Sequence, residues 1–282
     1  MRILDLPNQP NVVSEKSGGY FFLPAVQRQR GLRLLEKNYT EWNENEKDAL
    51  RSQLDQCSAT FHEFVRRAEG AGKTMVVKEH VPHLIEPIAK TQHVHRSQGS
   101  IGSPQGFDHQ TLLPDEFLLT WFPTFLVRHP ALAFPSELAS VMTLRWTRQL
   151  FDWYVNIWNQ LSAKNITRPK PIVLDADDIL ANPQIVVRFC DLVGLDSTKL
   201  CFSWEPLRSD ELRQTDPLKQ KMNATLLASS GIMQDKSAQN LNLDCEMEKW
   251  KAEFGETEAL KLTKWVDNAI PDYEYLRSHR LV

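Results

Sequence analysis

The sequence has no long, uninterrupted hydrophobic run. Its longest apolar stretch, Phe117 to Val127, is interrupted by Thr120, Pro123 and Thr124. That stretch is about half as long as a membrane-spanning helix. The N-terminus also lacks an apolar segment long enough for a secretory signal, and no small-residue cleavage site follows it. We therefore expect a cytoplasmic protein that has no membrane partner.

An excess of one charge and an abundance of cysteine are also missing. The chain has 33 Lys and Arg against 36 Asp and Glu, a formal net charge of −3. This balance argues against a protein that coats nucleic acid, so any anion-binding site must be local. The four cysteines are widely spaced, and no CxxC or nearby histidine completes a metal-ligand pattern. We expect reduced thiols and no metal site.

Short apolar runs alternate with longer helical patterns along the chain. The runs at 74–77, 124–127 and 171–175 are rich in β-branched residues, which is typical of strands buried inside a parallel sheet. Strands that alternate with helices indicate an α/β fold. With 282 residues, 41% of them hydrophobic, we expect one domain, residues 1–282.

Apolar residues three or four positions apart predict the helices between these strands. The expected helices are 31–71, a segment from Trp146 to Trp158, 183–194 and 244–269. Residues 1–31 are turn-rich, and nothing in them alternates long enough to predict a strand. Residues 85–113 are rich in Gly, Ser, Gln and His and exceed the usual connection length, so we interpret them as a long loop that acts as a lid or is partly mobile.

The strongest candidate site follows the run at 124–127. Arg128 leaves the predicted sheet at a carboxyl strand end, where α/β proteins bind ligands, and Ser136 lies eight residues further on. A guanidinium grips phosphate oxygens through two hydrogen bonds, and a hydroxyl at the next helix start adds a third. The alternative is structural: Arg128 pairs with a carboxylate and Ser136 caps a helix.

This arrangement resembles the 3′-phosphate-binding motif of sulfotransferases that use 3′-phosphoadenosine 5′-phosphosulfate. The segment Arg128-His-Pro-Ala-Leu-Ala-Phe-Pro-Ser136 is similar to a fungal branch of that superfamily, and 174–178 followed by Asn182-Pro183 resembles its strand, acidic pair and proline-started helix. The resemblance covers roughly residues 10–282. It implies a three-layer fold, a parallel sheet flanked by helices as in P-loop NTPases, with Arg128 and Ser136 binding the donor.

A second segment carries the implied catalytic groups. Val76-Val-Lys-Glu-His-Val-Pro82 is similar to the strand end that holds a sulfuryl-contacting lysine and the catalytic histidine of the cytosolic enzymes. By this resemblance Lys78 steadies the transferring group and His80 is the base. Histidine titrates near neutral pH and can accept the proton of an attacking hydroxyl. The alternative is that His80 is a histidine with an ordinary satisfied hydrogen bond.

The family pattern also has a part that the sequence lacks. The first strand and a loop resembling Tyr-Pro-(Lys/Arg)-Ser-Gly-Thr-Thr, which cradles the 5′-phosphosulfate, belong upstream of Met1. We therefore expect a sheet without its first strand and phosphate loop. Such a sheet exposes an unpaired edge, so either another segment fills the place or the chain forms a homo-oligomer.

Three functional hypotheses follow. The first is a sulfotransferase-like enzyme that acts on a small hydroxylated molecule. The second is a cofactor-independent acid–base enzyme of fungal secondary metabolism, a cyclase or dehydratase, that reuses His80, Lys78 or Asp175 on the same scaffold. The third is a non-catalytic remnant, or a sequence whose true first exon was missed.

Overall fold

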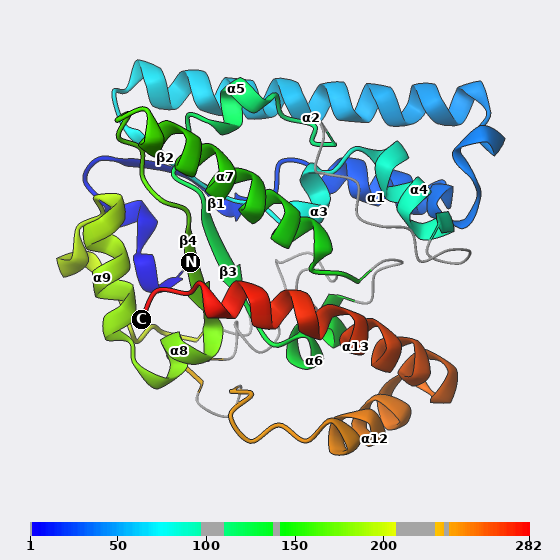
Figure 1. The fold of residues 1–282 in the computed structure, drawn as a ribbon. Coiled ribbons are helices and arrows are strands. Elements are labelled where there is room, and N and C mark those ends of the chain that lie inside the picture. Colours follow the sequence, from blue (N-terminus) through cyan, green and yellow to red (C-terminus); the bar gives the residue numbers. More distant parts are fainter. Residues whose placement is uncertain (1, 97–109, 138–141, 207–228, 234–236) are drawn as a thin grey trace. The chain divides into compact units, whose positions relative to one another are not determined.

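The structure is a computed structural model, and it describes residues 2–96, 110–137, 142–206, 229–233 and 237–282. The chain divides into two compact units, and each is described by itself. Unit 1 comprises Leu6–Phe122 and Gln149–Arg168, and unit 2 comprises Arg2–Asp5, Pro123–Arg148 and Pro169–Val282. Figure 1 shows the elements of both units along the chain.

Unit 1 contains one pair of parallel strands and several helices. Its elements are β1 (Val12–Gly19), α1 (Leu23–Gly31), α2 (Glu44–Gly70), β2 (Thr74–Lys78), α3 (Val81–Leu84), α4 (Pro87–Arg96), α5 (Asp115–Leu118) and most of α7 (Arg145–Ala163), with short 3-10 turns at Leu6–Asn8, Leu34–Glu36 and Tyr39–Glu41. The predicted helix 31–71 is shorter in the structure, because Asn43 starts α2 with a capping box that Glu46 completes.

The strand β1 was not predicted. It pairs in parallel with β2, Val12 opposite Thr74 and Gly19 opposite Lys78, with an irregular register between Ser14 and Gly19. The residues after Val13 are mostly polar and small, so they show no alternation of apolar and polar residues that would predict a strand. The segment is extended because it pairs with β2.

The expected loop 85–113 begins later than predicted. Helix α4, Pro87–Arg96, occupies its first part, and it buries Lys90 and Thr91. The Gly- and Ser-rich composition that suggested a loop belongs to residues 97–109, which lie outside the described part of the chain. The lid stays a prediction.

Unit 2 contains the second pair of parallel strands. Strand β3 (Thr124–Val127) pairs with β4 (Ile172–Asp175) in regular register, close to the predicted bounds. The other elements are a 3-10 turn at Arg2–Leu4, α6 (Pro130–Ala133), the 3-10 turn η5 (Phe134–Glu137), α8 (Ala176–Ala181), α9 (Gln184–Val193), a 3-10 turn at Ser197–Lys199, α12 (Leu243–Phe254) and α13 (Glu256–Ser278).

The single helix predicted for 244–269 is two helices. Gly255 has φ 83°, a left-handed conformation that glycine adopts without strain, and it separates α12 from α13. Helix α13 then runs through Pro271 to Ser278, beyond the predicted end at residue 269. Tyr273 and Leu276 beyond the proline are buried, and this packing offsets the hydrogen bond that Pro271 cannot donate.

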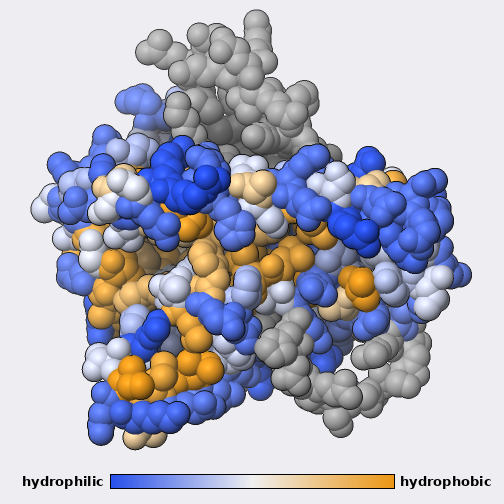
Figure 2. Space-filling model, turned by 90° about the horizontal axis from the view of Figure 1, so that it is seen from above, coloured by the Kyte–Doolittle hydropathy of each residue, from blue (hydrophilic) through white to orange (hydrophobic). Residues whose placement is uncertain are grey.

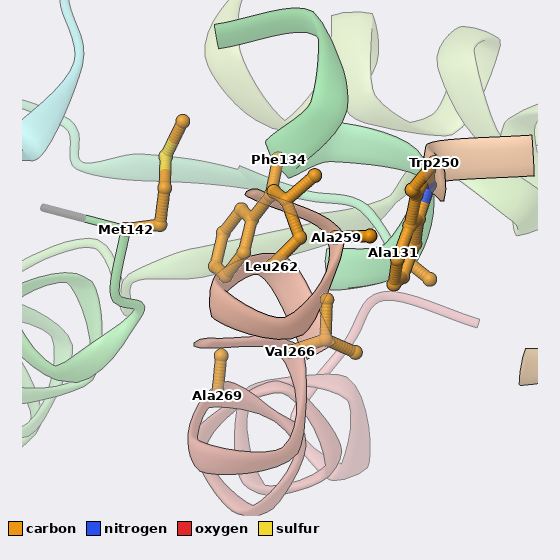
Figure 3. Close-up of a cluster of buried hydrophobic side chains, with 8 residues drawn as sticks. All are labelled: Ala131, Phe134, Met142, Trp250, Ala259, Leu262, Val266 and Ala269. Carbon is orange, nitrogen blue, oxygen red and sulfur yellow. The ribbon is translucent and has the colours of Figure 1, made fainter. Parts of the chain in front are cut away.

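A buried cluster in unit 2 supports the segment that follows β3. Figure 3 shows Phe134 of η5 beside Leu262 of α13, and Ala131 of α6 beside Trp250 of α12. The whole cluster comprises Ala131, Phe134, Met142, Trp250, Ala259, Leu262, Val266 and Ala269. Full burial of a side chain such as Phe134, Leu262 or Val266 contributes about 1.5–3 kcal/mol, and this packing fixes the turn between Arg128 and Ser136 to α13.

The observed sheets are small, parallel and compatible with an α/β fold. Strands buried on both faces are expected in such sheets, yet Leu126 of β3 is 59% exposed. Hydrophobic residues reach the surface elsewhere too, as the orange areas among the blue in Figure 2 show. In the described segments, no helix has both the length and the apolar character for a bilayer crossing.

Candidate functional site

The end of β2 presents two of the predicted residues together. Lys78 is the last residue of β2, and His80 follows at the N-cap of α3. Both are partly buried. A tyrosine that the sequence analysis missed contacts both: the Nζ of Lys78 is 5.1 Å from the ring centroid of Tyr20, and the His80 ring stacks on that ring at 5.2 Å.

Tyr20 owes its position to an unusual backbone. Gly19 has φ 118° and Tyr20 has φ 47°, and the Tyr20 N–H donates to the Lys78 carbonyl at 3.0 Å. A Cβ on Gly19 would stand 2.4 Å from the Lys78 carbonyl oxygen, so only glycine allows this close approach. A left-handed tyrosine is strained, and strain of this kind gathers at functional sites.

A carboxylate and a second imidazole complete the cluster. The Glu79 side chain is 4% exposed and the His83 side chain 12%, with Glu79 Oε1 lying 2.7 Å from His83 Nδ1. The His83 and His80 rings are 5.0 Å apart and nearly perpendicular. Sequence reasoning missed Glu79 and His83 as site residues, since their positions beside Lys78 and His80 gave no separate signal.

A surface hollow of about 360 Å³ adjoins this cluster. Gly19 and Tyr20 line it from the end of β1, and Gln53 and Gln56 line it from α2. Its size lies within the usual range of small-molecule sites. The hollow therefore gives the cluster a neighbouring space with polar amides on its wall.

The second predicted pair lies in unit 2. Arg128 directly follows β3, and Ser136 lies in η5. Burial lowers the pKa of the Arg128 guanidinium, and the Asp177 carboxylate opposes that effect. Asp177 also accepts hydrogen bonds from the Ala238 N–H at 3.1 and 3.2 Å. Arg128 thus belongs to a partly buried polar region at the carboxyl end of the strands.

The remaining polar groups of this strand end are internal to unit 2. Asp175, the last residue of β4, is 1% exposed, and burial raises its pKa. It accepts a hydrogen bond from the Tyr273 hydroxyl at 2.9 Å, and the Arg277 Nε lies 3.4 Å away. Its other oxygen accepts from the Asp177 N–H, which starts α8. These contacts make Asp175 a structural residue.

The structure thus brings Lys78 and His80 together in unit 1 and places Arg128 and Ser136 on consecutive segments of unit 2. In the described ranges, no group of three His, Cys, Asp or Glu side chains is arranged to hold a metal ion. Cationic groups at strand ends, such as Lys78 and Arg128, suit a phosphorylated or sulfated ligand.

Two curated proteins are similar to this chain over its whole length. "Sulfotransferase ppzF" of Metarhizium majus (strain ARSEF 297) is 37% identical, and the match covers 100% of this chain and 92% of that protein. "Sulfotransferase ppzF" of Metarhizium rileyi (strain RCEF 4871) is 35% identical with the same coverage. The chain belongs to this family of fungal sulfotransferase-like proteins.

Membership of the fungal sulfotransferase-like family confirms the family resemblance that the sequence analysis stated. No family model matches the chain. No solved structure matches it either.

Proposed function

We propose that the chain is a sulfotransferase that transfers a sulfuryl group from 3′-phosphoadenosine 5′-phosphosulfate to a small hydroxylated acceptor. The full-length similarity to proteins named sulfotransferase supports the class of reaction. The observation that carries the assignment of residues is the cluster at the end of β2. There the Lys78 ammonium and the His80 ring both contact the ring of Tyr20.

The proposed step follows from the chemistry of these side chains. The acceptor oxygen forms a bond to sulfur while the bond from sulfur to the bridging phosphate oxygen breaks. His80 takes the proton of the acceptor hydroxyl. The Lys78 ammonium stabilises the negative charge that develops on the transferring group and on the bridging oxygen. The products are a sulfate ester and adenosine 3′,5′-bisphosphate.

In the proposal, Arg128 and Ser136 hold the 3′-phosphate of the donor. A guanidinium after a strand and a hydroxyl in the next turn are donors that fit a phosphate. The buried packing of Phe134 and Ala131 supports this role, because it fixes the turn that joins the two residues. The proposal includes a three-layer α/β fold of the P-loop type.

Both relatives are named as sulfotransferases. The comparison therefore does not favour the hypothesis of a cofactor-independent acid–base enzyme or that of a non-catalytic protein. Asp175, one residue that the acid–base hypothesis would reuse, is held inside unit 2 by Tyr273 and Asp177. The cytoplasmic location, the place in secondary metabolism and the self-association of the chain stay predictions of the sequence.

Calorimetric titration of adenosine 3′,5′-bisphosphate into the purified chain tests the donor site. We expect binding to wild type and a loss of at least about tenfold in affinity for Arg128→Ala, the scale of a hydrogen bond to a charged group. Arg51→Ala is the control, because Arg51 is exposed and pairs only with Asp48 of its own helix among the described residues. Equal heats for wild type and Arg128→Ala would refute the donor site.

A transfer assay with labelled 3′-phosphoadenosine 5′-phosphosulfate and a panel of phenols and alcohols tests the reaction itself. We expect label in the organic product with at least one acceptor. Binding without transfer to any member of the panel would count against catalysis and return the non-catalytic hypothesis.

A further inference from the structure

Glu79, the neighbour of His80 in the chain, has a buried carboxylate that the proposed reaction does not use. Glu79 stands between Lys78 and His80 in the chain, and its side chain is 4% exposed. A buried carboxylate is costly unless its oxygens accept hydrogen bonds. The hydrogen-bond partners of Glu79 therefore show which segments its side chain holds in place.

Glu79 accepts from three separate segments of unit 1. Oε1 accepts from the His80 N–H at 3.1 Å and lies 2.7 Å from His83 Nδ1. Oε2 accepts from the Phe22 N–H at 3.1 Å, at the N-cap of α1. One side chain thus joins the connection after β1, the connection after β2 and helix α3.

Each of these segments contributes to the setting of the His80 ring. Tyr20, two residues before Phe22, stacks on one face of the ring with an interplanar angle of 24°. His83 meets the ring nearly edge-on, at 72°. The His80 backbone is bound directly. The Tyr20 and His83 rings, which both contact the His80 ring, thus belong to segments that are hydrogen-bonded to the Glu79 carboxylate.

We propose that Glu79 is a positioning residue that fixes His80 through its backbone, through His83 and through the Tyr20–Phe22 segment. The inference rests on the proposed function, since positioning matters only if His80 accepts a proton. A base must lie within hydrogen-bond reach of that proton, and a misplacement of about 1 Å can lower the rate a hundredfold.

Glu79→Gln tests the proposal. The amide has one acceptor oxygen and cannot accept from both the Phe22 N–H and the His80 N–H with the same geometry. We expect kcat to fall about tenfold or more while the KM for the sulfuryl donor stays at the wild-type value. Glu86→Gln is the matched control, because Glu86 is an exposed glutamate seven residues along the same segment.

A spectroscopic measurement separates positioning from a general loss of structure. In the full chain labelled with ¹³C-histidine, we expect the ring signal of His80 to move in Glu79→Gln and to stay in place in Glu86→Gln. The ring signal of His62, an exposed residue of α2, should not move in either variant. A fall in kcat with an unmoved His80 signal would overturn the proposal, as would an unchanged kcat.

His83→Gln covers the case in which Glu79→Gln fails to fold. It removes the edge contact to His80 and leaves the two backbone N–H donors to Glu79. We expect a smaller fall in kcat and a displaced His80 signal, and wild-type values for both would overturn the proposal. If wild type transfers no sulfuryl group, the proposed function fails, and the histidine signals still decide whether Glu79 holds the ring.

Discussion

The ends of β2 and β3 carry similar residue types and hold them in different ways. Each strand end carries a cation and a histidine: Lys78 ends β2 and His80 follows it, and Arg128 and His129 follow β3. At β2 the imidazole stacks on a tyrosine whose backbone is left-handed. At β3 the histidine caps α6, accepting from the Ala131 N–H, and its ring meets buried Tyr273 edge-on.

The two units also differ in how their buried charged side chains are bonded. Asp175 in unit 2 has a hydroxyl and a backbone N–H as donors, and Asp177 binds the Ala238 backbone. Unit 1 contains strain at Gly19 and Tyr20 and a buried lysine, Lys90. Backbone strain of this kind gathers at functional sites, and the hydrogen bonds of Asp175 and Asp177 support the scaffold of unit 2.

The largest effect is expected for Gly19→Ala. The new Cβ would stand 2.4 Å from a backbone oxygen at φ 118°, so the end of β1 must move. We expect a loss of about 3 kcal/mol in the free energy of unfolding, measured by urea denaturation. Gly31→Ala is the control, because Gly31 has open space around its Cβ position. Equal stability of the two variants would show that the Gly19 backbone is not strained.

The next effect is on turnover. His80→Ala should lower the rate of sulfuryl transfer by about a hundredfold or more, the scale of a general base. His62→Ala, at an exposed position of α2, should leave the rate unchanged. His129→Ala should act on stability, because the His129 ring caps α6 and packs edge-on against buried Tyr273. A similar loss of turnover in all three variants would remove the distinction between the two strand ends.

Lys90→Met should stabilise the protein. Lys90 is 6% exposed, and burial, together with the charge of Arg30, lowers its pKa to about 7, with Glu79 opposing. Between pH 7 and the ordinary value of 10.5 the unfolded chain binds more protons at this residue, so wild-type stability rises with pH across that window. The gain for Lys90→Met, roughly 1–4 kcal/mol, should be largest below pH 7 and shrink towards pH 10.

Thermal unfolding at several pH values measures this gain. Lys249→Met is the control, because Lys249 is exposed and pairs with Glu246. A stability difference between Lys90→Met and wild type that does not change from pH 6 to pH 10 would show that Lys90 is not the group responsible.

The smallest effect is expected in unit 2. Tyr273→Phe removes the hydroxyl that donates to buried Asp175, and an unsatisfied buried acceptor costs about 1–3 kcal/mol. We expect a loss near 1 kcal/mol, because the Asp177 N–H remains as a donor. Tyr39→Phe should change the free energy of unfolding by less than about 0.5 kcal/mol. A larger loss in Tyr273→Phe than in Gly19→Ala would reverse the comparison between the units.

The sequence predicted the elements whose residues carry their own signal. Strands β2, β3 and β4 are short apolar runs, and α9 has a proline before it and Gly194 after it, so their bounds are close to prediction. The strand β1 could not be predicted, because its polar residues are extended only through pairing with β2. The course of α13 through Pro271 depends on the burial of Tyr273, which no local pattern contains.

The candidate site divides in the same way. Lys78, His80, Arg128 and Ser136 could be predicted because they lie at or after recognisable strands and resemble family motifs. Tyr20 was missed because its place depends on two successive left-handed residues at the end of an unpredicted strand. Glu79 was missed because its role lies in hydrogen bonds to segments that are distant in the sequence, such as the Phe22 N–H.

The left-handed tyrosine places a limit on how far the protein can be improved by laboratory selection. Asparagine or glycine at position 20 would adopt φ 47° at a lower energy, so a screen for heat resistance favours them. Either replacement deletes the aromatic platform on which His80 and Lys78 rest. Selection for robustness and selection for turnover should therefore diverge at this one codon.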